Sequence, residues 1–270
     1  QIENYIWNLI EIGIDFIKIG YSSRNLSDET TEASGITDDK LELIISTTRK
    51  YNKEVAVHIS RLEDFNKIIN FPITSIEHLP NDGVISDETI EKIKECGVYL
   101  VPTLMFIKNF LYFDKFYDFL KSDNALKKFE PEARDILLAE CTNFKNNKFT
   151  KYDTENIEKN ISENLKKIIN NNLPIVIGTD AGAFYSFFGD YKEELYLMEQ
   201  HGMSPVNVLK SATIQAAKLL GVDSDTGKIE EGKFADMLLL SANPLENLHN
   251  IEKLEIVFKE GKAFYPEQIK

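Results

Sequence analysis

The sequence predicts an α/β fold in which short parallel strands alternate with helices, followed by a small β appendage. Two observations predict the parallel part: short apolar runs of β type alternate with helical stretches, and several of these runs end in a polar side chain that can bind a ligand. A third observation is the composition. The chain has 270 residues, 43% hydrophobic and 28% charged, as expected for one well-packed domain or one large domain with an appendage.

Five segments are predicted to form parallel strands, because each is a short apolar run bounded by turn or charged residues. The helical stretches between them are the long connections that parallel strands require. A closed ring of such strands points the residues at the strand ends toward a common centre. In chain order the predicted strands are Asp15–Ile19, Glu54–Ile59, Thr74–Glu77, Val98–Pro102 and Pro174–Gly178.

Three helices are predicted from their end signals and apolar spacing. Ser86 begins a helix that Gly97 ends, since a small oxygen acceptor caps the first amides and glycine tolerates a left-handed exit. Another helix spans 204–220, with proline near its start and glycine after its end. A third starts near Thr154 and has one apolar face, formed by Ile157, Ile161, Leu165, Ile168 and Ile169.

The stretch 103–173 has no strand signal and is predicted to form helices over one end of the ring of strands. It is rich in Phe, Tyr and Lys. We interpret its first aromatic residues as core or lid packing rather than as a cofactor site; they are Phe106, Phe110, Tyr112, Phe113, Phe116, Tyr117 and Phe119.

The composition changes after Gly221. The apolar run Met237–Leu240 predicts a strand, and the segment LEIVFKEGKAFYP predicts a hairpin that turns at Glu260 and Gly261. We therefore divide the chain into an α/β part, residues 1–225, and a β appendage, residues 226–270.

Charge and hydropathy exclude some classes of partner. The net charge is −13 with no basic stripe, so we expect no nucleic-acid partner, which would require phosphate neutralisation. No apolar run is long enough to span a bilayer, and we expect no membrane partner. The start lacks the features of a signal peptide. Because the first residue is Gln, a segment can precede it, and localisation stays open with the cytoplasm as the default.

Four further polar residues are given no functional role. Cys96 and Cys141 show no Cys-x-x-Cys spacing and no disulfide framework, so they are predicted to be reduced and partly buried. His201 is interpreted as a helix-end residue, and His249, in a polar turn, as a surface residue.

The candidate site consists of four side chains at the carboxyl ends of predicted strands. They are Lys18 in DFIKIG, His58 in VAVHIS, His78 in SIEHLP and Asp180 in IVIGTDAG. His58 and His78 are one βα unit apart, so neighbouring strands present them side by side. Neutral imidazole binds zinc, manganese and iron, and a carboxylate can complete the ligand set and accept a proton. No other cofactor is predicted.

Each candidate also has a structural interpretation. A single histidine at a strand end is often a hydrogen-bonded core residue, and Asp180 can cap the turn that follows it. The ammonium of Lys18 is costly to bury unpaired, and its structural role would be a salt bridge to Glu77, which is itself interpreted as structural. The pairing of two histidines at matching strand ends favours the metal hypothesis.

The motifs together resemble the C-terminal part of the metal-dependent amidohydrolase superfamily, near its imidazolonepropionase and prolidase-like branch. The segments that carry the resemblance run in family order over nearly the whole chain: DFIKI, VAVHIS, SIEHLP, VYLVPTL, IVIGTDAG, HGMSPVNVLKSATIQAAKLLG and KIEEGKFADMLLLSANPLENL. GTDAG followed by the last two segments is the most specific combination.

The resemblance implies a partial TIM-like (β/α)8 barrel, with Lys18 on its fourth strand, His58 on its fifth, His78 on its sixth and Asp180 on its eighth. Residues 226–270 then belong to a small β-sandwich. The implied cofactor is a divalent metal, zinc, as one or two ions. Lys18 would carry a carbon dioxide adduct that bridges two ions, and His58 and His78 would bind the second ion. Asp180 would bind the first and act as the base.

The sequence departs from the family pattern at the first strands. The family has a His-x-His motif there, whereas the four histidines of this chain include no such pair. Strands one to three have no counterpart either. We expect that an N-terminal segment has been lost, that a complementary chain supplies it, or that this is a degenerate half-barrel. Open strand edges would favour association, including homo-oligomers.

Three functions are compatible with these features. The main hypothesis is a metal-dependent hydrolase of C–N bonds in amides, lactams or dipeptide-like small molecules. The alternative is a truncated, non-catalytic half-barrel that acts as a binding or partner-dependent module. A third is a lyase or esterase with one metal ion, since a fold does not fix a reaction. The loop after Asp180 is aromatic and suggests an apolar or ring-bearing substrate, although Phe184, Tyr185, Phe187 and Phe188 can instead pack against the helical lid.

Overall fold

The computed structural model describes residues 1–21, 36–146, 153–182 and 186–268. Its centre is a parallel sheet with the strand order β1-β2-β3-β4. The strands are β1 (Phe16–Gly20), β2 (Glu54–His58), β3 (Ser75–Glu77) and β4 (Tyr99–Val101). Four of the five predicted strands are therefore confirmed, as is the α/β class. That the sheet forms part of a (β/α)8 barrel stays a prediction.

The fifth predicted strand, 174–178, is reduced to a single parallel bridge between Leu100 and Ile175. Leu100 donates its amide to the Pro174 carbonyl, and Val176 donates its amide to the Leu100 carbonyl, both at 2.9 Å. The amide of Ile177, on the opposite edge of this segment, donates to the Ser211 carbonyl at 3.4 Å. Asp180 nonetheless follows the segment that lies beside β4.

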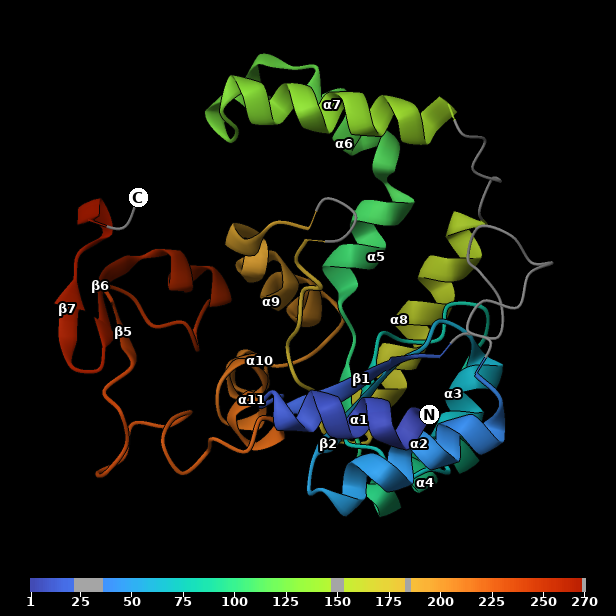
Figure 1. Cartoon of the computed structure of the whole chain (residues 1–270). Helices are drawn as coiled ribbons and strands as arrows, with labels where there is room; N and C mark the ends of the chain where they lie inside the picture. Colours follow the sequence, from blue (N-terminus) through green and yellow to red (C-terminus); the bar gives the residue numbers. More distant parts are fainter. Residues whose placement is uncertain (22–35, 147–152, 183–185, 269–270) are drawn as a thin grey trace.

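One face of the parallel sheet is apolar and covered by helices. Alternate residues of neighbouring strands lie in register on this face, and all are almost fully buried: Ile17, Ile19, Val55, Val57, Ile76 and Leu100. The covering helices, which Figure 1 shows around the sheet, include α2 (Asp38–Lys50), α3 (Leu62–Ile68), α4 (Asp87–Cys96) and α8 (Thr154–Asn170). Their buried residues Ile45, Phe65, Ile93 and Leu165 join the same core.

The other face of the sheet is partly open at β1. Phe16 is 45% exposed and Lys18 is also exposed, although the residues between and after them are buried. Helix α1 (Ile2–Glu11) precedes this strand and packs against α2. A groove of about 500 Å³ runs between α1 and β1. This second face of the first strand is thus accessible in the part of the chain that the structure describes.

Helix α4 is confirmed with both of its predicted end signals. The Ser86 hydroxyl accepts a hydrogen bond from the Thr89 amide at 3.1 Å, and Gly97 adopts a left-handed conformation with φ of 65°. The first amides of this helix therefore have a side-chain acceptor.

We expect Ser86→Ala to lower the free energy of unfolding by about 1 kcal/mol, because it removes this capping acceptor. Thr37→Ala is the matched control, since Thr37 precedes α2 and makes no capping hydrogen bond with its side chain. Urea denaturation measures both. Equal losses in the two variants would contradict the capping role of Ser86.

The other predicted helices are confirmed in outline. In α8, Ile161, Leu165 and Ile168 are buried, as the apolar spacing predicts. The stretch 204–220 is divided into α10 (Pro205–Ala212) and α11 (Ile214–Leu219). The division falls at Thr213, whose backbone leaves the helical region with φ of −126° and ψ of −93°. A single long helix was therefore not the correct prediction here.

The stretch between β4 and α8 is helical, as predicted. It contains α5 (Leu104–Leu111), α6 (Phe113–Leu120), the short 3-10 helix η1 (Asp123–Lys127) and α7 (Pro131–Asn146). Figure 1 shows α5 rising from the sheet and α6 and α7 lying together beyond it. Helix α9 (Tyr191–Gln200), preceded by η2 (Phe188–Asp190), packs against α5.

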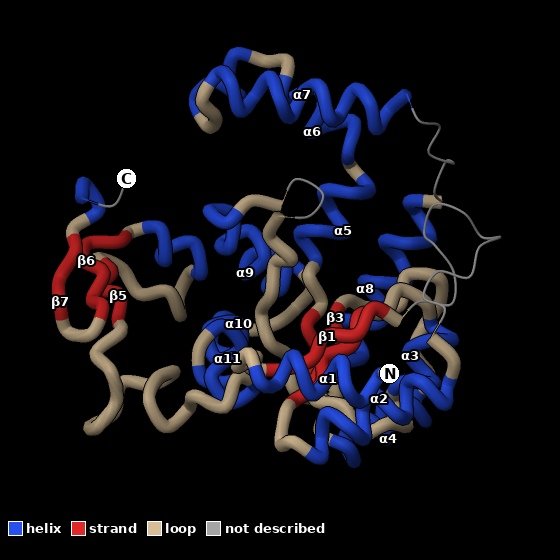
Figure 2. Tube along the Cα trace, in the orientation of Figure 1, coloured by secondary structure: helices blue, strands red, loops and turns tan. Residues whose placement is uncertain are grey.

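The C-terminal segment forms a separate antiparallel sheet with the order β5-β6-β7. Its strands are β5 (Met237–Leu240), β6 (Leu254–Lys259) and β7 (Lys262–Phe264), with η3 (Leu248–Glu252) before β6 and η4 (Pro266–Gln268) after β7. Glu260 and Gly261 have positive φ angles of 51° and 78°, which confirms the predicted hairpin turn. Figure 2 shows this sheet apart from the parallel sheet. The boundary at residue 225 stays a prediction.

Candidate metal and catalytic site

The second face of the parallel sheet carries the candidate polar residues. In the register of the strands, Gly20 pairs with His58 and His58 with Glu77, while Lys18 pairs with Ala56, two residues before His58. Because side chains alternate along a strand, Lys18, His58 and Glu77 project from the same face, opposite the apolar core. His58 is the last residue of β2 and Glu77 is the last residue of β3. Both therefore lie at the carboxyl end of the sheet, where the sequence predicts the candidate site.

His78 joins this face through an unusual backbone conformation. One residue after Glu77, regular alternation would direct its side chain to the opposite face. Its φ of 71° interrupts that alternation, and its ring lies edge-on to the His58 ring with 4.6 Å between centroids. A left-handed conformation is uncommon outside glycine, although histidine adopts it more readily than most residues, and such conformations cluster at functional sites.

Asp180 approaches the same point from the segment beside β4. Its Oδ2 lies 4.0 Å from Nε2 of His78, and its side chain is 30% exposed, compared with 5% for His78. Asp180 also has a left-handed backbone, with φ of 51°. The structure thus brings together His58, His78 and Asp180, three of the four predicted side chains.

Hydrogen bonding orients the ring of His78. Nδ1 of His78 lies 2.5 Å from the Thr103 hydroxyl, which also lies 2.8 Å from the Pro102 carbonyl. A carbonyl only accepts, so when the hydroxyl gives its single proton to Pro102 it accepts from Nδ1, and the ring proton is then on Nδ1. In this tautomer the Nε2 lone pair faces Asp180. This is the arrangement in which a histidine can bind a metal ion.

Both imidazoles are held in the neutral form. Burial, together with the charges of His58 and Lys18, lowers the pKa of His78 to about 3. Burial and the Lys18 charge also lower the pKa of His58, although Asp180 and Asp64 oppose that shift. The contact between His78 and Asp180 is therefore not a salt bridge, and both rings have a lone pair available at neutral pH.

The side chain of Lys18 is exposed at the open face of β1. The sequence predicts a cost for burying its ammonium group, and this cost does not arise because the sheet edge leaves the face uncovered. Lys18 makes no ion pair with Glu77 within 4.0 Å among the described contacts, so the alternative structural role is not observed. Its charge nonetheless lowers the pKa of His58 and His78.

Glu77 is better explained as a structural group. Its carboxylate accepts a hydrogen bond from the Ser75 hydroxyl at 2.6 Å, two residues back on the same face of β3. Burial raises its pKa, and the Ser75 bond and the Lys18 charge oppose that rise.

The donor chemistry of this cluster fits a divalent metal ion, whereas its geometry is incomplete. Among the residues that the structure describes, no group of three or more His, Cys, Asp or Glu side chains is arranged to hold an ion. Donor atoms around four-coordinate zinc lie about 3.3 Å apart. The 4.0 Å between His78 and Asp180 is within a small side-chain adjustment of that value. Two neutral imidazoles and a carboxylate are suitable zinc ligands.

Two buried residues near the cluster were not predicted from the sequence. Thr103 orients His78, and the fully buried Glu194 of α9 accepts hydrogen bonds from the amides of Leu104 and Met105. The only sequence signal for Thr103 is its place directly after a predicted strand. A single Glu in a charged helical stretch gives no signal for Glu194.

Glu194 makes stability depend on pH. Burial raises its pKa from 4.5 to about 7, although the two amide donors oppose the shift. The folded chain therefore holds this proton more tightly than the unfolded chain. The contribution of Glu194 is complete below about pH 4.5 and is lost as pH rises through about 7. As pH rises from about 5 to about 8, we expect the loss of this contribution to lower the free energy of unfolding by up to about 3 kcal/mol.

Urea denaturation at the two pH values measures this effect. Glu194→Gln should lose that part of the pH dependence, whereas Glu193→Gln, on the same helix and only partly buried, should keep it. The titratable neighbour of Glu194 is Tyr191, whose pKa is raised to about 12 by burial and by the Glu194 charge, so it does not titrate in this range. An unchanged pH profile in Glu194→Gln would contradict the assignment.

Aromatic residues near the site show packing, in agreement with the structural interpretation. Phe106 is buried, with its ring 5.5 Å from that of His78. Phe187, in the loop after Asp180, contacts Phe116 and Phe129, at ring distances of 6.1 and 4.9 Å. Phe184 and Tyr185 lie outside the described residues, and for Phe188 only the backbone is described.

The two remaining histidines lie elsewhere. His201 ends α9, and its Nδ1 is 2.8 Å from the Leu197 carbonyl. His249 is exposed and stacks on Tyr196, with 3.9 Å between ring centroids. The predictions that His201 is a helix-end residue and His249 a surface residue are confirmed.

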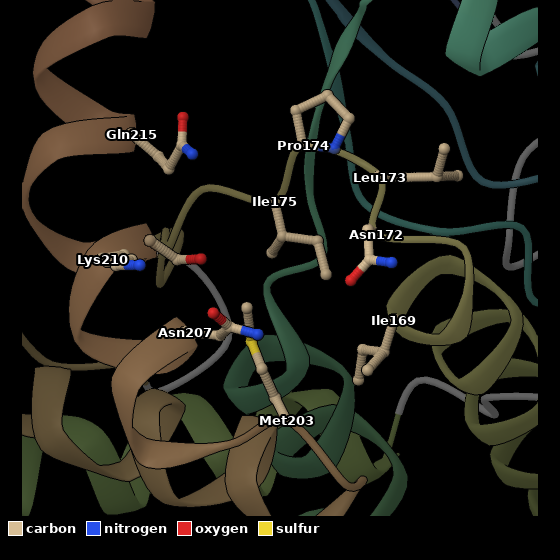
Figure 3. Close-up of a pocket in the computed structure, with 10 residues that line it drawn as sticks. Ile169, Asn172, Leu173, Pro174, Ile175, Met203, Asn207, Lys210 and Gln215 are labelled. Atoms are coloured by element: carbon tan, nitrogen blue, oxygen red, sulfur yellow. The ribbon is translucent and has the colours of Figure 1, made fainter. Parts of the chain in front are cut away.

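A cavity of about 210 Å³ opens at the other end of the segment 174–178. Figure 3 shows Pro174 and Ile175 lining it together with Met203, Asn207 and Lys210. These residues lie at the start of the segment, whereas Asp180 follows its end. The cavity is therefore separate from the histidine cluster.

Comparison with known proteins establishes the class of this chain. A sequence model of the amidohydrolase family matches residues 29–264, and the chain belongs to this family. The resemblance inferred from the motifs is thereby confirmed.

Individual relatives are distant and longer. Ochratoxinase from Aspergillus niger is 25% identical over 261 residues, which are 94% of this chain and 47% of ochratoxinase. An uncharacterized protein from Mycobacterium tuberculosis is 22% identical over 230 residues, 85% of this chain and 53% of that protein. The chain thus spans about half the length of the curated relatives it matches.

Solved structures share the fold. A Xaa-Pro dipeptidase with bound methionine superposes with a TM-score of 0.70 and 26% identity, over 98% of this chain and 58% of the dipeptidase chain. The crystal structure of the A. niger ochratoxinase gives a TM-score of 0.71 at 21% identity, over 98% of this chain and 54% of the other. At that identity, the second similarity concerns the fold alone.

Proposed function

We propose that this chain belongs to a metal-dependent hydrolase of C–N bonds in amides, lactams or dipeptide-like small molecules. The observation that carries the proposal is the meeting of His58, His78 and Asp180 at the carboxyl ends of neighbouring parallel segments. In barrels of this class, reactive groups lie at that end of the strands. Membership of the amidohydrolase family, and the similarity to a dipeptidase and an ochratoxinase, support it.

His58 and His78 would hold the metal ion, and the free Nε2 of His78 faces the space in which it would bind. A bound divalent ion, for which we propose zinc, would supply the activation of water and the polarisation of a carbonyl oxygen. Asp180 would contribute a carboxylate oxygen and accept a proton. Its partial exposure gives a substrate a path to this group.

Lys18 is the fourth proposed ligand, through a carbon dioxide adduct that converts its cation into an anionic group. It pairs with Ala56, two residues before His58, and so projects from the same face of the sheet as His58. A second ion would require this group. Its exposure means that closing the face over β1 is a further requirement for a complete site.

Hydrolysis of a substrate panel tests the proposed activity. The panel contains Xaa-Pro and other dipeptides, N-acyl amino acids and lactams, with zinc and bicarbonate present, and amine release is measured. We expect turnover of at least one class, abolished by a chelator. Absence of turnover throughout, with the chain folded and zinc bound, would contradict a hydrolase formed by this chain.

A second candidate function is a non-catalytic, partner-dependent module. The observation that favours it is the open face of β1, where Phe16 and Lys18 are exposed in a family whose matched members are about twice as long. A complementary N-terminal chain, or a second copy of this chain, would cover that face. Sedimentation analysis distinguishes the cases, because a folded monomer with turnover contradicts this alternative.

We propose no nucleic-acid partner, because the net charge of −13 disfavours contact with phosphates. No helix among the described residues is long and apolar enough to cross a membrane.

A further inference from the structure

Glu194 is a buried carboxyl group that binds the first amides of a different helix. It lies on α9 with no exposed surface, and its two oxygens accept the amides of Leu104 and Met105, at 2.8 and 2.7 Å. These are the first two residues of α5, whose amides have no acceptor within their own helix. A carboxylate from α9 thus caps the first amides of α5. The positive end of the α5 dipole favours the negative charge of this carboxylate.

Thr103 stands directly before these amides, in the position from which a threonine usually caps its helix. Its side chain makes no capping hydrogen bond. The Glu194 carboxylate supplies the acceptors instead, and the Thr103 hydroxyl is left free to accept from Nδ1 of His78. Helix capping and orientation of His78 would otherwise compete for the Thr103 hydroxyl. In this structure Glu194 caps the helix and Thr103 orients the histidine.

The backbone of Thr103 needs such external support. Its φ of 50° is left-handed, which is rare for a β-branched residue and persists only where the surroundings hold it. On one side it is tied through Leu104 and Met105 to Glu194, and on the other through its hydroxyl to Pro102 and His78. Thr103 and His78 are both at least 95% buried, so no solvent can replace these contacts.

We infer that Glu194 is a positioning residue for His78, acting through the first amides of α5 and the hydroxyl of Thr103 to keep the Nε2 lone pair free and directed at Asp180. This inference rests on the proposed function for its catalytic meaning, because it treats His78 as a metal ligand. The orientation of the ring itself can be measured without metal or substrate.

Nitrogen-15 NMR of the imidazoles in the metal-free chain at pH 8 tests it. The chain has four histidines, and the His78 signals are assigned by their loss in His78→Gln. We expect the wild type to carry the His78 proton on Nδ1. Thr103→Val should lose this single tautomer, whereas Thr103→Ser should keep it.

The same experiment on Glu194 separates positioning from simple helix capping. Glu194→Gln has one acceptor oxygen in place of two, so we expect a mixture of His78 tautomers. Glu194→Asp, whose carboxylate reaches less far, should give the same mixture, while Glu193→Gln should match the wild type. Zinc affinity, measured by competition with a chelator, should fall about 10- to 100-fold in Glu194→Gln.

Two results would overturn the inference: a wild-type His78 with its proton on Nε2, or a folded Glu194→Gln and Glu194→Asp that both retain the wild-type tautomer. The outcome is separable from that of the proposed function. The expected tautomers in a chain that binds no zinc would support the positioning role and contradict the hydrolase. Turnover by the wild type, with unchanged His78 tautomers in the Glu194 variants, would support the hydrolase and contradict the positioning role.

Discussion

Asp180→Asn is expected to reduce kcat for the hydrolysed substrate by about 10²- to 10⁴-fold, measured at saturating zinc. The amide of asparagine can still offer an oxygen to the metal ion, but it cannot accept a proton at neutral pH. Asparagine also tolerates the left-handed backbone that Asp180 adopts, so the fold should be preserved. The prediction therefore separates loss of the base from loss of structure.

The matched control is Glu230→Gln, which makes the same charge change at an exposed position in the C-terminal segment. Its kcat should equal that of the wild type. Turnover by Asp180→Asn within a few-fold of the wild type would show that another group acts as the base.

His58→Ala combined with His78→Ala should abolish the stabilisation of the folded chain by zinc. A ligand that binds only the folded state stabilises it by about 4 kcal/mol at a thousand times its Kd, so the wild-type Tm should rise by several degrees with zinc. Without two imidazoles, too few donors remain to bind the ion. Thermal unfolding with and without zinc measures the difference.

The other two histidines provide the control. The double variant His201→Ala, His249→Ala removes equal imidazole content away from the strand ends. It should retain the zinc-dependent rise in Tm. A rise that survives loss of His58 and His78, or that disappears in the control, would place the metal elsewhere.

Local sequence signals were enough to predict much of this fold and the places of His58 and Glu77 at strand ends. The strand that ends at His58 and the helix between Ser86 and Gly97 have short-range causes: an apolar run, a capping hydroxyl and a glycine exit. The meeting of His58 with His78 was predicted from neighbouring strand ends, but His58 pairs with Glu77, and His78 reaches His58 through its left-handed backbone. Their roles as ligands stay predictions.

Long-range contacts explain what could not be predicted. Thr103 meets His78 across 25 residues, and Glu194 meets Leu104 across 90, and neither pairing leaves a local pattern. The exposure of Lys18 depends on what covers the second face of the sheet, which a strand's own sequence does not specify. The segment 174–178 keeps a single bridge to β4, while its Ile177 amide bonds to Ser211 of α10, a contact that leaves no local sequence pattern.

The metal content of the purified wild-type chain tests the central claim most directly. After loading with zinc and exhaustive dialysis, elemental analysis should find about one or more equivalents per chain, since His58, His78 and Asp180 supply the ligands. A folded chain that retains no zinc would contradict a metal site formed by these three residues.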